Sequence, residues 1–387
     1  MKKGLMALLV GVLFLASASL VSAAEYPGPL VDMDWVQAHL DTIKDPTQTE
    51  IRLVEVSKKG YDKEHIPGAV WVKWGSEVFE PGTDHMILDY GSISAVMKKL
   101  GVTPDTHIVI YSDSLTQAAR FYWTLKYWNV EKISLMGATK KAWKAEGRPL
   151  TTEVPAVQPR DYEIKFPPNT KIYALLHPDV MNGLATGKVL FVDNRPAKYV
   201  EGKKYSLSKW VRAGTIPGAI GWAAPEEVTK DGKLLPVEEL KKQAESKGIT
   251  PDKNIIVFCN TGVRSSLGWF ILHELLGYPN VKNYDGSMRE YANSFYLPMD
   301  PDSFLIYKDF PKAPILEVKE TAESAKSAAD ENAKKIAELE KQLEETRKIA
   351  EAAKAEGKGL CGPTSVALLA ALPLAGYALR RRYLKKN

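Results

Sequence analysis

Short apolar runs rich in β-branched residues alternate along this chain with longer stretches in which apolar residues recur at helical spacing. The clearest runs are residues 108–111 and 255–258, and amphipathic stretches follow them at residues 117–127 and 265–276. Strands that alternate with helices in this way form a mostly parallel sheet, because each crossover between parallel strands is made by a helix. The pattern therefore predicts an α/β fold in which helices flank mostly parallel sheets.

The same pattern occurs twice, which predicts two domains of similar structure. An Ile-Pro-Gly-Ala turn at residues 66–69 recurs at residues 216–219, and each turn follows an apolar run that ends in a carboxylate, Glu55 or Asp193. A segment rich in Pro and Thr separates the two halves. We expect a first domain at residues 27–150, a linker at residues 151–168 and a second domain at residues 169–314.

The two ends of the chain have the composition of targeting segments. Lys2 and Lys3 precede an apolar run that closes with Val-Ser-Ala, so residues 1–23 are predicted to be a secretory signal peptide. Residues 361–387 contain Cys-Gly-Pro, an apolar run and a basic cluster that should remain in the cytoplasm. This tail resembles the Cys-Gly-Pro sorting signals of some exported prokaryotic proteins, and a plain membrane anchor is the alternative. Either reading makes the membrane a partner and places the body at the cell surface or on the periplasmic side.

Residues 317–357 differ from the rest of the chain because they consist largely of Ala, Glu and Lys. Their sevenfold spacing brings few large aliphatic residues to one face, so any coiled coil and any self-association through it would be weak. A single solvated helix is the alternative. Both readings predict a helical stalk between the body and the tail.

The formal net charge of +5 is concentrated at the two ends of the chain. Two lysines fall in the predicted signal and five basic residues in the tail, which leaves a body that is close to neutral. A nucleic-acid-binding protein would carry a basic patch on its folded part. We therefore exclude nucleic acid as a partner.

Cys259 is the residue that says most about chemistry. The chain has two cysteines, and the other, Cys361, lies in the tail, so Cys259 has no disulfide partner in the body. It follows the apolar run 255–258 and begins the loop Cys-Asn-Thr-Gly-Val-Arg, which leads into a helical stretch. Loop amides and the start of a helix stabilise a thiolate or a sulfur-bound anion. This setting predicts a catalytic thiol, and an inert buried cysteine is the alternative.

Four motifs together resemble the tandem-domain rhodanese family, the thiosulfate and 3-mercaptopyruvate sulfurtransferases. They are residues 193–195 (Asp-Asn-Arg), residues 214–219, residues 259–264 and the Asp-Gly step at residues 285–286. The resemblance covers residues 27–312. It implies that Cys259 of the second domain carries sulfane sulfur as a persulfide and that the first domain is catalytically empty. Ser112 stands where a cysteine of the first domain would be.

This mechanism assigns a role to each residue of the candidate site. The backbone of the loop should hold the extra sulfur through its amide groups, since these can face a negative charge. Arg264 and Lys198 are the predicted cations for an anionic donor, and Lys198 fits the position of a basic residue of the family only approximately. Arg195 should pair with a carboxylate such as Asp193, or with a loop carbonyl, and so brace the turn beside the site. The loop residues assigned to binding are Asn260, Thr261, Gly262, Val263 and Arg264.

The expected partners are a small anionic sulfur donor, with thiosulfate as the first choice, and a thiol or cyanide acceptor. We expect no cofactor and no metal, because no cluster has metal-ligand spacing. One alternative is a persulfide-binding or scaffold module without catalysis. Another is a phosphatase or arsenate reductase on the same fold, although four residues separate Cys259 from Arg264 where those enzymes have five.

Overall fold

The computed structural model describes residues 26–204, residues 212–301 and, further along, residues 330, 331, 333–342, 344, 345 and 348. The predicted signal peptide, the tail at residues 361–387 and most of the predicted stalk lie outside the described residues and stay predictions. The described residues between 330 and 348 are helical and exposed. The chain divides into two compact units, Met1–Phe310 and Pro311–Asn387. Within the described part of the chain, no helix has both the length and the apolar character needed to cross a membrane.

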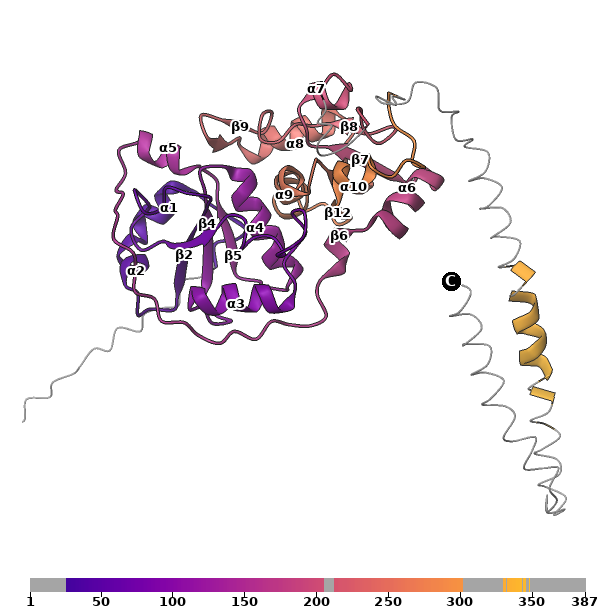
Figure 1. The fold of residues 1–387 in the computed structure, drawn as a ribbon, viewed down its shortest axis with the longest axis horizontal. Helices are drawn as coiled ribbons and strands as arrows, with labels where there is room; N and C mark the ends of the chain where they lie inside the picture. Colours follow the sequence, from indigo (N-terminus) through magenta and orange to yellow (C-terminus); the bar gives the residue numbers. More distant parts are fainter. Residues whose placement is uncertain are drawn as a thin grey trace, which may run out of the picture. The chain divides into compact units, whose positions relative to one another are not determined.

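The first half of the larger unit contains a parallel five-stranded sheet in the order β1-β5-β4-β2-β3 (Figure 1). Its strands are β1 (Leu30–Val31), β2 (Ile51–Ser57), β3 (Val70–Lys73), β4 (His107–Tyr111) and β5 (Ile133–Met136). Its helices are α1 (Met33–Ala38), α2 (Leu40–Lys44), α3 (Tyr90–Leu100), α4 (Leu115–Tyr127) and α5 (Lys140–Ala145). The apolar run that the sequence singled out is the central strand β4, which is buried along its whole length.

The second half repeats this topology with a parallel sheet in the order β6-β12-β11-β7-β8. Its strands are β6 (Tyr173–Ala174), β7 (Val189–Asp193), β8 (Ile220–Gly221), β11 (Asn254–Phe258) and β12 (Val281–Tyr284). Its helical segments are η1 (Thr170–Ile172), η2 (Leu176–Val180), α6 (Met181–Thr186), α7 (Ala197–Val200), α8 (Val237–Ser246), α9 (Val263–Trp269), η3 (Phe270–Leu275) and α10 (Ser287–Tyr291). The prediction of α/β domains with parallel sheets flanked by helices is confirmed.

One hairpin departs from the parallel pattern and was not predicted. Strands β9 (Thr229–Lys230) and β10 (Lys233–Leu234) are antiparallel and lie against the first half. The amide of Leu234 donates to the carbonyl of Gly137, and the amide of Thr139 donates to that of Gly232. The hairpin therefore joins the two halves through backbone hydrogen bonds.

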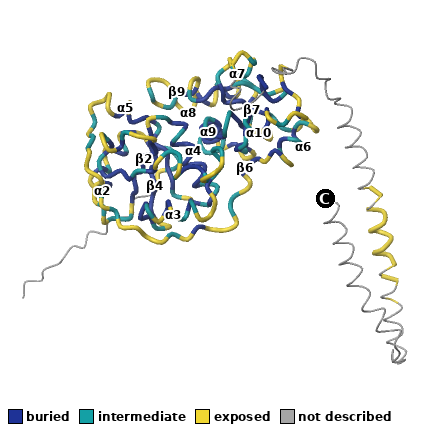
Figure 2. Tube along the Cα trace, in the orientation of Figure 1, coloured by how far each residue is buried: buried dark blue, intermediate teal, exposed yellow. Residues whose placement is uncertain are grey.

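The two halves share a hydrophobic core. Helices α4 and α9 pack against each other, and Trp123 of α4 and Trp269 of α9 belong to one buried cluster. Tyr122 meets Phe270 edge to face, with ring centroids 4.9 Å apart. The central strands and the helices at this junction are drawn in the dark blue of buried residues, whereas the connecting segments at the surface are yellow (Figure 2). Because burial of aromatic side chains dominates packing energetics, this contact fixes the two halves as one unit.

Candidate active site

Cys259 lies at the carboxyl end of β11, the middle strand of the second sheet. In a parallel sheet the carboxyl ends of the strands meet at one edge, where sites are usually found. Its side chain is buried, with 1% of the residue's surface exposed. The carbonyl of Cys259 accepts from the amide of Met288 at 3.1 Å, and its amide donates to Ser287 Oγ at 3.1 Å. The thiol is thus held at a fixed place between β11 and α10.

Ser287 fixes the loop and was missed by the sequence analysis. Its hydroxyl oxygen accepts the amides of Cys259 and Gly262, the latter at 3.0 Å, and donates to the carbonyl of Tyr284 at 2.6 Å. The residue has a φ of 49°, a left-handed conformation that is uncommon outside glycine. The available signal was the hydroxyl directly after the Asp285-Gly286 step.

Gly262 allows a close approach between the loop and a buried ion pair. Its φ is 70°, and a Cβ there would lie 2.5 Å from Asp285 Oδ1 and 2.7 Å from Arg120 Nη1. Arg120 comes from α4 of the first half and pairs with Asp285, and both side chains are fully buried. Asp285 also accepts the amide of Ile87 at 2.8 Å, and Arg120 donates to the carbonyl of His85 at 2.9 Å. This network ties the first half to the underside of the cysteine loop.

The remaining loop amides are available to a ligand. The amides of Asn260, Thr261, Val263 and Arg264 have no hydrogen-bond acceptor among the described residues. The loop itself is anchored from the other side, because the amide of Arg289 donates to the carbonyl of Asn260 at 3.0 Å. Unpaired amides at the start of a helix favour a negative charge. They are four of the five amides that the sequence assigned to holding a sulfur-bound anion, and the fifth, that of Gly262, is occupied by Ser287 instead.

A cavity of about 240 Å³ opens beside Cys259 and has walls from both halves. The second half contributes the loop with Arg264. The first half contributes side chains that follow β3 and β4 in the chain, none of which the sequence analysis proposed. The lining residues are Trp74, His85, Ser114, Thr116, Gln117, Cys259, Asn260, Thr261, Val263 and Arg264. The first half is therefore a wall of the candidate site.

The two predicted cations differ in their placement. Arg264 lines the cavity, but its guanidinium donates to the Ala224 carbonyl at 2.9 Å and to the Glu226 carboxylate at 2.7 Å. Its charge is thus already partly balanced. Lys198 is exposed on α7 and is not among the residues that line this cavity. The structure does not bring Lys198 to Cys259, and its role as a substrate contact stays a prediction.

Asp193 and Arg195 form the predicted ion pair at the end of β7. Arg195 donates from Nε and Nη2 to both carboxylate oxygens of Asp193, and from Nη2 to the carbonyl of Gly214 at 2.8 Å. Thr215 adds a hydroxyl donor to Asp193 at 2.7 Å. All these side chains are buried and none lines the cavity. The pair therefore braces the turn that begins at Gly214.

The buried phenol of Tyr284 contacts α10 through Glu290. Burial, together with the carboxylate of Glu290, raises the pKa of Tyr284 well above its ordinary value. The phenol stays protonated and donates to Glu290 Oε2 at 2.8 Å. Because the carbonyl of Tyr284 also accepts from Ser287, this residue helps to place the hydroxyl that holds the cysteine loop.

Comparison with known proteins now identifies the family. Residues 32–146 and 177–294 each match the rhodanese-like domain. The chain belongs to the rhodanese family. The chain is 38% identical over 287 residues to the sulfur carrier protein TtuD of Thermus thermophilus, and this alignment covers 71% of the chain and 97% of the relative. It is 34% identical over 281 residues to a putative thiosulfate sulfurtransferase of Haloferax volcanii, and that alignment covers 70% of the chain and 96% of the relative.

A solved rhodanese structure has the same fold. The 3-mercaptopyruvate sulfotransferase SseA of Escherichia coli superposes with a TM-score of 0.56 and 28% identity, covering 67% of this chain and 98% of its own. The resemblance that the four sequence motifs suggested is thus confirmed for the tandem rhodanese body.

The first rhodanese domain has a serine at the place that Cys259 takes in the second. Ser112 follows β4 as Cys259 follows β11, and it is fully buried. His65, directly before the first Ile-Pro-Gly-Ala turn, is buried, and its ring nitrogens lie 2.7 Å from the Tyr61 carbonyl and 2.9 Å from the Glu153 carbonyl.

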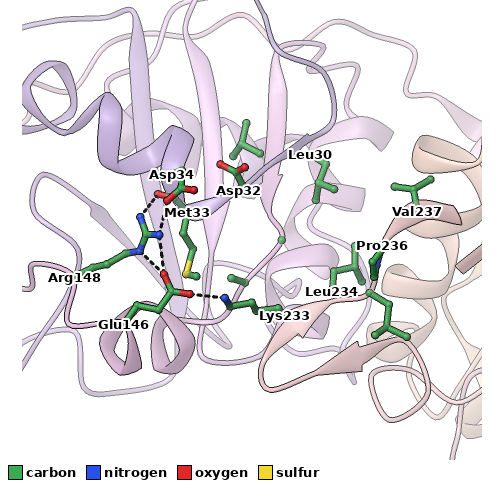
Figure 3. Close-up of a pocket in the computed structure, with 14 residues that line it drawn as sticks. Leu30, Asp32, Met33, Asp34, Glu146, Arg148, Lys233, Leu234, Pro236 and Val237 are labelled. Carbon is green, nitrogen blue, oxygen red and sulfur yellow. Dashed lines mark hydrogen bonds and ion pairs between the residues drawn. The ribbon is translucent and has the colours of Figure 1, made fainter. Parts of the chain in front are cut away.

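A second cavity of about 560 Å³ lies elsewhere in the rhodanese body, between α1, α5 and the β9–β10 hairpin (Figure 3). Figure 3 shows Arg148 reaching Asp34 and Glu146, and Lys233 reaching Glu146. These charges neutralise one another, and no cysteine lines the cavity. Within the described ranges no group of His, Cys, Asp and Glu side chains is arranged to hold a metal ion.

Proposed function

We propose that this protein takes sulfane sulfur from thiosulfate or a related anionic donor and passes it, as a persulfide on Cys259, to a thiol or cyanide acceptor. Membership of the rhodanese family makes the chain a sulfurtransferase. The observation that carries the proposal is the setting of Cys259, a buried thiol at a strand end beside unpaired loop amides and a cavity. That setting suits a nucleophile which must store an anionic sulfur.

The proposed reaction has two steps. With thiosulfate, the Cys259 thiolate attacks the outer sulfur, a new S–S bond forms, and sulfite leaves with the electron pair of the old one. The acceptor thiolate or cyanide then attacks the terminal sulfur, and Sγ leaves again as a thiolate. The terminal sulfur of the persulfide carries the negative charge between the steps. Hydrogen-bond donors fixed toward this sulfur therefore lower the activation barriers of both steps.

The unpaired amides of the loop supply these donors. Asn260, Thr261, Val263 and Arg264 contribute four N–H groups, whereas the amides of Cys259 and Gly262 are occupied by Ser287. Arg264 adds a positive charge that Glu226 partly balances. Because the charge is shared, we expect it to favour small anions at the entrance without holding the sulfite product tightly.

Two alternatives fit the site less well. A phosphatase or arsenate reductase must surround a tetrahedral oxyanion, yet the loop is one residue short for that purpose and Ser287 uses two of its amides. Its arginine would also have to leave Glu226. A persulfide-binding or scaffold module would have the same thiol, so only a turnover measurement separates it from an enzyme.

We also propose that the protein is exported and tethered. The supporting observations are the signal-like residues 1–23, the Ala-, Glu- and Lys-rich segment at 317–357 and the Cys-Gly-Pro tail at 361–387. The body would then act at the cell surface or on the periplasmic side of the membrane, with the helical stalk as a spacer. Fractionation of cells expressing the full chain, with and without residues 361–387, tests this part. A full chain that stays in the cytosolic fraction would contradict it.

Mass spectrometry of the full chain tests the sulfur chemistry. After thiosulfate, polysulfide or mercaptopyruvate, we expect a gain of one sulfur on the peptide that contains Cys259 and its loss on adding cyanide. Cys259→Ser should abolish the gain, while the matched control Cys361→Ser should retain it. Thiocyanate formed over many turnovers separates an enzyme from a sulfur-binding module. Sulfur on Cys361 alone, or none with any donor, would refute the proposal.

A further inference from the structure

A buried hydroxyl lies next to the reactive sulfur and has no role in the mechanism so far. Ser265, in the first turn of α9, is fully buried. Its Oγ lies 3.5 Å from Cys259 Sγ and 2.6 Å from Asn283 Oδ1. The first distance is within hydrogen-bonding range for sulfur, which is a weak donor as a thiol and an acceptor as a thiolate. A hydroxyl has one proton, so it can donate to only one of these two atoms at a time.

The neighbouring side chains determine where that proton points. Asn283, fully buried on β12, has one side-chain atom 3.2 Å from the Gly262 carbonyl and 3.1 Å from Ser266 Oγ. A carbonyl only accepts, so this atom must be the amide nitrogen. Ser266 itself donates to the Gly262 carbonyl at 2.7 Å and therefore accepts from Asn283. The oxygen of Asn283 is left facing Ser265, whose proton it accepts.

It follows that the hydrogen bonds around the sulfur differ between its two protonation states. With a thiol, the S–H group donates to the lone pairs of Ser265, which donates in turn to Asn283. With a thiolate, the same lone pairs would face a negative charge, so the hydroxyl must turn toward Sγ and give up its bond to Asn283. A hydrogen bond to a charged group is about twice as strong as a neutral one, which favours that turn of the hydroxyl toward the buried sulfur.

We propose that Ser265 is a rotating hydroxyl that donates to Sγ of Cys259 only while this sulfur is a thiolate, with Asn283 as its alternative acceptor. The thiol proton leaves to solvent, and Ser265 keeps its own proton throughout. Apart from the S–H bond, whose electron pair stays on Sγ when the proton leaves, only these hydrogen bonds change. The place of this step in a reaction rests on the proposed function, but the hydroxyl switch itself does not.

In the proposed reaction the switch acts twice. Sγ is an anion when it attacks the sulfur donor and again when it leaves the persulfide. Between these steps Sγ is bonded to a second sulfur that carries the charge, and Ser265 returns to Asn283. The loop amides would serve the terminal sulfur between the two steps, and Ser265 would serve Sγ during each step, while Sγ is an anion. The two charged positions, one bond apart, thus have separate donors.

The test measures thiolate formation in the full chain without any sulfur donor. The rate at which iodoacetamide alkylates Cys259 is followed against pH, with peptide mapping to separate it from Cys361. Ser265→Ala should move the midpoint of this profile upward by about one pH unit, which corresponds to one lost charge-assisted hydrogen bond. Ser266→Ala is the matched control, since it removes a buried hydroxyl on the next residue that bonds Gly262 and Asn283. Its midpoint should stay in place.

A second variant predicts the opposite direction. Asn283→Leu removes the alternative acceptor, leaves Ser265 free to serve Sγ, and should move the midpoint downward. Near-ultraviolet circular dichroism checks the fold of each variant. In the unmodified protein at low pH, the infrared S–H band of Cys259 should show the lowered frequency of a donating thiol. An unshifted or lowered midpoint in folded Ser265→Ala, or a band without that lowered frequency, would overturn the proposal.

The two proposals fail separately. A midpoint that shifts as expected in a protein that gains no sulfur would retain the hydroxyl switch and remove the sulfurtransferase mechanism. If Ser265→Ala forms the persulfide at an unaltered rate and its alkylation midpoint does not move, the sulfurtransferase mechanism is retained and the hydroxyl switch is removed.

Discussion

The two rhodanese domains end their central strands in the same way, but only the second has a cysteine in the loop that follows. In the first, Glu55 of β2 lies opposite Tyr111 of β4, and in the second Asp193 of β7 lies opposite Phe258 of β11. The next residue, Ser112 or Cys259, offers its carbonyl to an amide across the loop. That amide belongs to Lys140 in the first domain, at 3.0 Å, and to Met288 in the second, at 3.1 Å.

The difference lies in how each loop is closed. The first is one residue shorter, since α4 begins at Leu115 whereas α9 begins four positions after Cys259. Ser112 Oγ accepts the amide of Ser114 and donates to Gln117, both at 3.1 Å, so this loop closes on itself. The second loop has a left-handed turn at Gly262, with φ of 70°, and a hydroxyl from Ser287, which lies outside the loop. Reactivity is therefore a property of the loop and its anchor, because the fold beneath is shared.

The largest effect is expected from moving the cysteine between domains. Ser112→Cys in a Cys259→Ser background should gain no sulfur from thiosulfate, because residue 112 is buried in a shorter loop that closes on itself. Mapping the mass of the residue 112 peptide checks this. A persulfide there would mean that the shared fold suffices for reactivity and would break the comparison.

The next effect concerns the ion pair that joins the two domains. Arg120→Met leaves the Asp285 carboxylate buried without its cation, and breaking a buried pair in this way costs about 3–5 kcal/mol of unfolding free energy. Denaturant unfolding of the full chain measures it. The matched control is Lys98→Met, which breaks the exposed pair with Asp161 and should cost less than about 1 kcal/mol. Equal losses in the two variants would show that the domains do not depend on this pair.

A third difference between the domains is a titrating group at the start of the central strand. β4 begins with His107, which is buried and has its Nε2 2.7 Å from Ser134 Oγ, whereas β11 begins with the exposed Asn254. Burial, aided by the charges of His39 and Lys132, lowers the pKa of His107 from 6.5 to about 4. The unfolded chain then binds this proton more tightly than the folded one, so stability contributed by neutral His107 is present above pH 6.5 and lost as the pH falls toward 4.

His107→Asn copies the second domain's residue into the first and should remove this dependence. The difference in unfolding free energy between the unmodified chain and the variant should fall by about 3 kcal/mol between pH 6.5 and pH 4. Denaturant titrations at several pH values measure it. A difference that stays constant over this range would exclude His107 as the group responsible.

The sequence could predict features that depend on neighbouring residues. The apolar runs became β4 and β11, and the helical stretch at residues 117–127 became most of α4. The loop at Cys259 was predictable because strand, turn and helix signals follow one another without interruption. The pairing of Asp193 with Arg195 was predictable for the same reason, since the two residues are two positions apart. Local spacing was sufficient for these features.

Contacts between distant residues could not be predicted. Arg120 meets Asp285 across 165 positions, and the walls from Trp74 and His85 depend on how the two domains dock. The β9–β10 hairpin has strands of two residues without an apolar run, so no periodicity marked it. Lys198 was assigned from its approximate match to a basic position of the rhodanese family, and an approximate match does not determine where a side chain of α7 lies.

The smallest effect is expected from removing one of two hydroxyls that lie at corresponding places in the two domains. Ser287 and Thr139 each precede the residue whose amide meets the central loop, but Thr139 caps α5 through the amide of Ala142 while Ser287 binds the cysteine loop. Thr139→Ala should cost about 1 kcal/mol of stability and leave persulfide formation unchanged. Ser287→Ala should cost about 1–3 kcal/mol, because buried amides lose their acceptor, and slow persulfide formation by about tenfold or more. Ser287→Gly fits the φ of 49° and should regain about 1 kcal/mol of stability while formation stays slow. Recovery of both stability and rate in the glycine variant would mean that backbone conformation, and not the hydroxyl, distinguishes the reactive loop from the closed one.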